Sequence, residues 1–151
     1  MLYDTAQGNS KGVRFETTIG INAPVGTVWA LIDRLEEWPR WMPSIKNIER
    51  LSKEPLAVGS QLSVTARVSG LTVTLLMTIA EFDWERSVVM QGKVLGTKLT
   101  RFYALEPVGD MTRVTIGGDV SGTLAWLARR GGKKISDEIA LAVKKRIEGW
   151  E

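Results

Sequence analysis

A succession of short alternating segments followed by one long helical segment restricts the fold of this chain most. Between residues 59 and 120, apolar and polar side chains alternate with the two-residue period of a strand, and Gly- or Pro-containing turns separate the runs. From about residue 123 the apolar spacing changes to that of a helix, which we expect to extend to residue 148. Consecutive strands without intervening helices indicate an antiparallel meander, so the order of elements predicts an α+β protein.

The segment before the meander predicts one strand and two short helices. Alternation over residues 13–21 indicates the strand. Pro24 is expected in the first turn of the following helix, where its missing N–H costs nothing, with Asn22 or Ala23 near the cap. A second short helix or turn is expected over residues 36–42, and Pro43 ends it.

The later elements are expected at the following places. Strands are predicted over residues 46–51, 59–68, 71–79, 87–91, 97–106 and 112–120, and Ser69-Gly70 is expected to form a tight hairpin turn. The Gly131-Gly132 pair is expected to interrupt the C-terminal helix, because each Gly costs about 1 kcal/mol relative to Ala in a helix interior, and to mark either a kink or a place where the helix approaches another group closely.

Composition predicts one domain and excludes several partners. The 151 residues suit a single domain, which we assign to residues 13–151, preceded by a flexible tail over residues 1–12. A formal charge of +3 is too small an excess to indicate nucleic acid. No apolar run reaches the length of a membrane span, and the N-terminus lacks the pattern of a secretory signal, so we expect no stable membrane insertion and a cytoplasmic location.

Two missing residue types restrict the chemistry. The chain contains no Cys and no His, which excludes thiolate nucleophiles, imidazole bases and metal sites built on either ligand. No Asp-rich loop indicates a site for a hard cation. We therefore predict no metal and no cofactor, and the sequence identifies no catalytic residue.

Four short motifs carry a family resemblance: INAP at residues 21–24, VWALID at 28–33, WPRWMP at 38–43 and VGS at 58–60. With the order of elements over residues 13–148, they resemble the polyketide cyclase/dehydrase and lipid-transport superfamily, the START-like and Bet v 1-like group also called SRPBCC. The resemblance implies a helix-grip fold, in which a seven-stranded antiparallel sheet wraps around the long C-terminal helix, with two short helices after the first strand. It also implies a deep apolar cavity, and it transfers no catalytic residue.

The strand over residues 97–106 carries the most distinctive chemistry. Alternation places Arg101 and Tyr103 on one face with Leu99 and Leu105. If that face is concave, Arg101 offers a bidentate donor to a carboxylate or carbonyl group, and Tyr103 offers a hydroxyl. Two alternatives leave Arg101 without a ligand: a bulge that turns it into solvent, or an ion pair with Glu81.

The other expected ligand contacts are apolar and come from several elements. Aromatic and Met side chains near the cavity mouth suit a lipid-like or polycyclic ligand. For Trp41 and Trp126 ordinary packing is the alternative, and Trp29 and Trp38 are expected in the core. The predicted contacts are Trp41, Met42, Val64, Val73, Leu75, Met77, Trp126 and Ile135.

These observations support three functional hypotheses. The first is binding or carriage of a hydrophobic small molecule, lipid-like, polyketide or aromatic, in an internal cavity. The second is a cyclase or dehydratase in which Arg101 and Tyr103 orient a polyketide in the same cavity. The third is an interaction module whose partner docks on the basic C-terminal helix, which contains Arg129, Arg130, Lys133 and Lys134; a solvated helix face explains the same charges. The sequence gives no indication of the oligomeric state.

Overall fold

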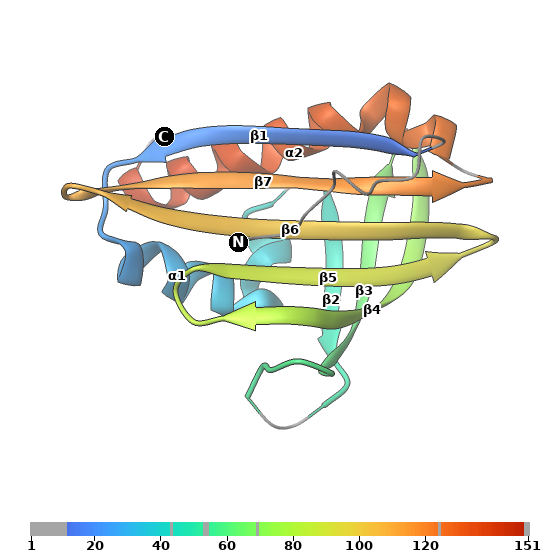
Figure 1. Ribbon diagram of the computed structural model, residues 1–151, viewed down its shortest axis with the longest axis horizontal. Helices are drawn as coiled ribbons and strands as arrows, with labels where there is room; N and C mark the ends of the chain where they lie inside the picture. Colours follow the sequence, from blue (N-terminus) through green and yellow to red (C-terminus); the bar gives the residue numbers. More distant parts are fainter. Residues whose placement is uncertain (1–11, 43, 53–54, 69, 124, 150–151) are drawn as a thin grey trace.

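The computed structural model describes residues 12–42, 44–52, 55–68, 70–123 and 125–149. The predicted tail therefore lies outside the described residues apart from Gly12, as do Pro43 and Ser69. The elements in chain order are β1 Val13–Ile21, α1 Val25–Asp33, the short 3₁₀ helix η1 Leu35–Arg40, β2 Ile45–Arg50, β3 Gln61–Val68, β4 Leu71–Asp83, β5 Ser87–Val94, β6 Thr97–Val108, β7 Met111–Gly122 and α2 Ala125–Glu148 (Figure 1).

The strands form one antiparallel sheet whose order is β1-β7-β6-β5-β4-β3-β2. Strands β2 to β7 are a meander, and β1 pairs with the last strand at the edge of the sheet. The sheet bends so that β2, β3 and the first part of β4 lie behind the other strands, while the later part of β4 runs in front beside β5, and α2 runs alongside β1 and β7 (Figure 1). The predicted α+β helix-grip architecture is confirmed.

The main core fills the space between the concave face of the sheet and the helices. α1 presents Val28, Trp29 and Ile32 to it, which is the stripe expected from helical spacing. Trp29 and Trp38 are each 2% exposed, so both belong to the core as predicted. From α2 the core receives Ile139, Ala140 and Val143.

Several element boundaries differ from the prediction. Pro24 occupies the N-cap with an extended backbone, so the helix begins one residue later, and no side chain caps it. α2 passes through Gly131-Gly132 without interruption, which corrects the expected break. Two glycines disfavour the helical conformation locally, but the tertiary packing of the rest of α2 offsets this effect. Tertiary packing contributes more to helix stability in a protein than intrinsic propensity does.

The C-terminal end of α2 is fixed to the end of β1 by a small polar network. The Lys144 ammonium donates to the Gly20 carbonyl at 2.7 Å and to the Glu148 carboxylate at 2.8 Å. The backbone N–H of Asn22 donates to the same carboxylate at 2.8 Å. This network holds the C-terminal end of α2 against β1, the edge strand of the sheet.

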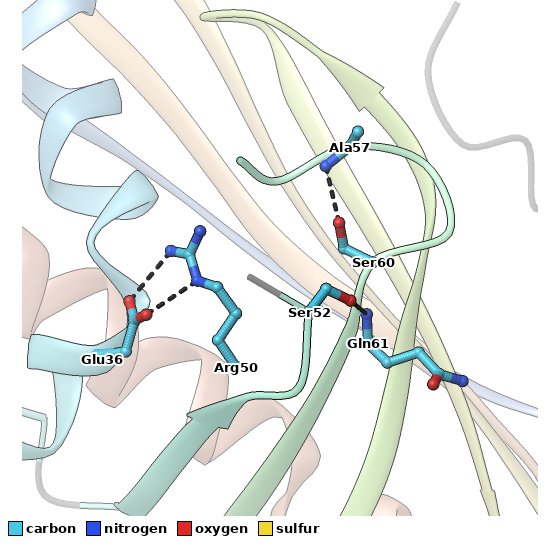
Figure 2. Close-up of polar contacts among 6 residues, drawn as sticks. All are labelled: Glu36, Arg50, Ser52, Ala57, Ser60 and Gln61. Carbon is cyan, nitrogen blue, oxygen red and sulfur yellow. Dashed lines mark hydrogen bonds and ion pairs between the residues drawn. The ribbon is translucent and has the colours of Figure 1, made fainter. Parts of the chain in front are cut away.

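A second set of polar contacts holds η1 and the β2–β3 connection (Figure 2). Arg50 of β2 donates to both carboxylate oxygens of Glu36, at 2.8 and 3.1 Å. Desolvation opposes ionisation of Glu36, but the hydrogen bonds from Arg50 prevail and lower its pKa below 4.5. The Ser60 hydroxyl accepts from the Ala57 N–H at 3.0 Å and stabilises the turn that leads into β3. Among the described helices none is long and apolar enough to cross a membrane.

Candidate ligand-binding site

A partly open apolar cavity of about 90 Å³ lies between the concave face of the sheet, η1 and α2. Its deep wall is formed by buried side chains, including Trp38 of η1, Met90 of β5 and Ile139 of α2. Its outer wall is formed by half-buried side chains: Val64, Ala66, Val73, Leu75, Leu99 and Ile135. Exposure therefore increases toward the end of the sheet where the β3–β4 hairpin and the start of α2 lie, and we take that end as the mouth.

Arg101 enters the cavity from the middle of β6. It lies in a row of directly opposed residues across four strands, with Met90 on one side and Gly118 and Phe15 on the other. Its guanidinium carbon lies 5.7 Å from the centre of the Phe15 ring, a cation–π distance. The residue between Arg101 and Phe15 is Gly118, which has no side chain, so the Arg101 side chain can reach the Phe15 ring.

One end of the Arg101 guanidinium has no partner among the described residues. Its Nη1 atom is buried and donates no hydrogen bond to any carboxylate or carbonyl oxygen among the described residues, and the Ser44 hydroxyl on the same cavity wall is also buried without a partner among them. A buried polar group without a hydrogen bond costs about 1–3 kcal/mol, and more when it is charged. The cavity thus combines an apolar wall with polar groups that an oxygen-bearing molecule would satisfy.

Tyr103 lies next to Arg101 on the same face and packs edge-on against Trp38, with ring centres 5.2 Å apart. Burial raises the pKa of the Tyr103 phenol to about 12, against the opposing effect of the Arg101 charge. The phenol therefore stays protonated at neutral pH and can donate a hydrogen bond or accept one.

The structure brings most of the sequence-predicted contacts together. Seven of them line the cavity: Val64, Val73, Leu75, Met77, Arg101, Tyr103 and Ile135. Three do not. Met42 is 1% exposed in the core, Trp41 packs beside Trp38 with ring centres 6.2 Å apart, and Trp126 is 52% exposed at the start of α2.

Glu81 does not pair with Arg101. A register irregularity between Ile79 and Glu81 in β4 shifts the strand and places the carboxylate on the convex face. There it lines a wider hollow of about 460 Å³ together with Asp83, Arg86 and other polar groups. That hollow is lined largely by polar and charged side chains, so the inner cavity, whose wall is mainly apolar, remains the candidate site.

Sequence reasoning missed part of the lining. Leu62, Ala66 and Leu99 lie on the predicted inner faces of their strands, so alternation was sufficient to find them. Leu35, Trp38, Ile45 and Ile48 come from η1 and β2, whose position against the sheet has no local sequence signal. In the part of the chain that the structure describes, no group of His, Cys, Asp or Glu is arranged to hold a metal.

Residues 12–148 match the family described as polyketide cyclase/dehydrase and lipid transport. The match covers most of the chain, and the protein belongs to this family. No curated protein matches it in sequence.

Solved structures with the same fold include proteins of different activity. A START superfamily protein from Mycobacterium smegmatis is 18% identical with a TM-score of 0.76, covering 91% of this chain and 99% of that one. The Zhui aromatase/cyclase from Streptomyces sp. R1128 is 13% identical with a TM-score of 0.80, covering 91% and 94%. Norcoclaurine synthase from Thalictrum flavum, in complex with dopamine and hydroxybenzaldehyde, is 13% identical with a TM-score of 0.69, covering 93% and 88%. At these identities the likeness establishes the fold alone.

Proposed function

We propose that this protein binds an apolar small molecule carrying one oxygen-bearing group, with the apolar body in the cavity and the oxygen at Arg101. The observation that carries the proposal is the buried Arg101 Nη1, which has no acceptor within the described part of the chain and faces an apolar wall. A ligand oxygen would remove the cost of that unpaired donor, and a charge-assisted hydrogen bond is the stronger kind. Membership of a family of polyketide cyclases and lipid-transport proteins supports the same ligand class.

The size of the cavity sets a condition on the ligand. Sites for drug-sized ligands enclose roughly 300–1,000 Å³, whereas this cavity measures about 90 Å³. A lipid-like or polycyclic ligand must therefore displace the half-buried side chains at the mouth. Those side chains are apolar and only partly covered, so they are the part of the wall with the fewest packing contacts to lose.

The proposal is tested with two probes that share a naphthalene body and differ in charge. Anilinonaphthalene sulfonate is anionic, and phenylnaphthylamine is neutral. We expect the native protein to bind both, and Arg101→Met to weaken the anionic probe at least about tenfold, since a hydrogen bond to a charged group contributes about 1.5–3 kcal/mol. The neutral probe should change less than about twofold.

Arg67→Met is the matched control. Arg67 also borders the cavity, but its side chain is exposed at the mouth, so its removal changes the net charge equally without touching the buried donor. Circular dichroism of each variant separates loss of binding from loss of fold. Failure of the native protein to bind either probe, or equal weakening of both probes by Arg101→Met, would contradict the proposal.

A cyclase or dehydratase activity is the second candidate. It is favoured by the adjacent donors on β6: a guanidinium and a phenol that remains protonated can both polarise a ligand carbonyl. In that case Tyr103→Phe abolishes turnover of an offered polyketide while probe binding is kept. Turnover that is unchanged in both Tyr103→Phe and Arg101→Met would remove this mechanism.

A further inference from the structure

The tip of the β5–β6 hairpin has three features that are unfavourable for the local structure or for solubility. It turns through Leu95 and Gly96, both with positive φ, of 48° and 74°. Such a turn favours Asn, Asp or Gly at its first position, whereas a bulky Leu is strained there. The Leu95 side chain is 78% exposed, the largest exposed fraction among the large hydrophobic residues of the described chain.

The third feature of the tip is its charge. Lys93 and Lys98 are directly opposed across the hairpin, and both are exposed. Like charges at this position destabilise a strand pair. Neither ammonium group forms an ion pair with a carboxylate of the described residues. Sites that violate local rules without a structural gain are where function is expected.

Other exposed apolar groups lie at the same end of the sheet. A Cβ at Gly96 would lie 3.1 Å from the Thr123 hydroxyl, so the tip abuts the connection into α2. Trp126, three residues further on, is 52% exposed, and Leu71 at the start of β4 is also 52% exposed. Figure 1 shows the β5–β6 tip and the start of α2 at the right end of the molecule. This is the end toward which the cavity wall becomes exposed.

The opposite end of the sheet provides a comparison within the molecule. It also exposes large apolar side chains, including Trp84 and Val108. However, its turns contain three acidic residues, Asp83, Glu85 and Asp110, and one basic residue, Arg86, whereas the β5–β6 hairpin contributes only lysines. Both ends therefore expose large apolar side chains, but their turns differ in the sign of their charge.

We propose that the end of the molecule formed by Lys93, Leu95, Lys98, Leu71 and Trp126 docks on an anionic lipid surface. Leu95 and Leu71 enter the boundary between headgroups and acyl chains, and Trp126 lies at headgroup depth, where aromatic side chains accumulate. Lys93 and Lys98 face the anionic headgroups. A nucleic acid fits less well, because stacking needs interleaved aromatic residues and this surface has one. The docked end is the mouth of the cavity, and the docking does not depend on the cavity ligand.

Sedimentation of the full chain with lipid vesicles tests this inference. We expect binding to vesicles that contain phosphatidylserine, weaker binding when salt is raised, and little binding to phosphatidylcholine alone. The double variant Lys93→Glu and Lys98→Glu should lower the partition coefficient by at least about tenfold. Lys145→Glu with Arg146→Glu makes the same charge change at exposed sites at the C-terminal end of α2, away from the hairpin, and should retain most of the binding.

Leu95→Asn is the decisive variant, because it separates docking from folding. Asn-Gly is the preferred pair for this turn, so the variant should have an equal or higher melting temperature and yet lower vesicle binding severalfold. Arg101→Met should bind vesicles as the native protein does, so failure of ligand binding and failure of docking are distinguishable. Equal binding to both kinds of vesicle, or unchanged binding by the Lys93 and Lys98 double variant, would overturn the inference. Binding to heparin that depends on Lys93 and Lys98, without binding to vesicles, would also overturn the inference.

Discussion

Gly118 separates Arg101 from Phe15 on the concave face of the sheet. A Cβ at this position would lie 2.3 Å from the Thr100 carbonyl oxygen and 3.3 Å from the Phe15 ring. The first of these is a backbone atom of the neighbouring strand and cannot rotate away. Gly118→Ala should therefore lower the free energy of unfolding by about 1–3 kcal/mol, the usual cost of overpacking, as measured by denaturant unfolding.

Gly20→Ala is the control for this substitution. Gly20 also lies in a strand, but its nearest neighbour to an added Cβ is the end of the Met111 side chain at 3.7 Å, which is ordinary contact. Replacing Gly by Ala where the backbone permits it is neutral or stabilising through the unfolded state. If Gly118→Ala and Gly20→Ala lower the free energy of unfolding equally, the close contact with the Thr100 carbonyl oxygen is not the cause of the destabilisation.

At the residue scale, strand alternation predicted the concave face of β6 because the period of two is a property of the backbone itself. Arg101 and Tyr103 were located in this way. The same rule failed for Glu81, since the irregularity after Ile79 changes the parity and carries no recognisable residue pattern. Trp126 could not be placed either, because an exposed tryptophan and a buried one look the same in a helical stripe.

At the scale of elements, the join between α2 and β1 makes stability depend on pH. The hydrogen bonds from Lys144 and from the Asn22 N–H lower the pKa of Glu148 below 4.5, and those from Lys133 and Thr17 lower the pKa of Asp137 below 3.8. A carboxyl group with a lowered folded pKa adds stability above its unfolded pKa and loses it as pH falls through the folded value. The melting temperature should therefore fall as pH is lowered from about 4.5.

Glu148→Gln identifies this contribution. Its melting temperature should be below that of the native protein at neutral pH, and the difference should shrink once the native carboxyl is protonated. Glu138→Gln is the matched control, because Glu138 lies on the same helix and forms no ion pair with the described residues. A difference between Glu148→Gln and the native protein that stays constant from neutral to acid pH would contradict this account.

Element types were easier to predict than their limits. The change from strand to helix period identified α2, but the Gly131-Gly132 pair suggested a break that the helix does not have. The reason is that propensity acts over one residue, whereas the contacts of α2 with β1 and β7 act over the whole helix. Pro24 was expected inside the first turn and instead precedes it, a difference of one position that propensity does not resolve.

At the scale of the whole molecule, the sheet and α2 enclose a cavity whose residues come from most of the chain. Its lining residues extend from Leu35 to Ile139, so only the global curvature of the sheet brings them together. The family pattern predicted that curvature, and it did not predict the volume. Volume depends on how far the half-buried residues at the mouth close over the interior, which is set by packing between elements distant in sequence.

Blocking that mouth is the sharpest test of how the fold and the site are connected. Ala66 is half-buried on the outer cavity wall, and its β4 partner across the strand pair is Val73. An apolar cavity of about 150 Å³ holds benzene, so the phenyl ring of Ala66→Phe would take up the whole of the 90 Å³ present. We expect at least tenfold weaker binding of both naphthalene probes, with a melting temperature that changes by only a few degrees.

Ala57→Phe adds the same ring at an exposed position in the β2–β3 connection and should bind both probes as the native protein does. The comparison distinguishes entry into the cavity from adsorption on the surface, because only the first depends on space behind Ala66. Unchanged probe binding by Ala66→Phe would place the probes outside the cavity. In that case the apolar wall around Arg101 would be core packing, and the unpaired guanidinium would have to be satisfied by water.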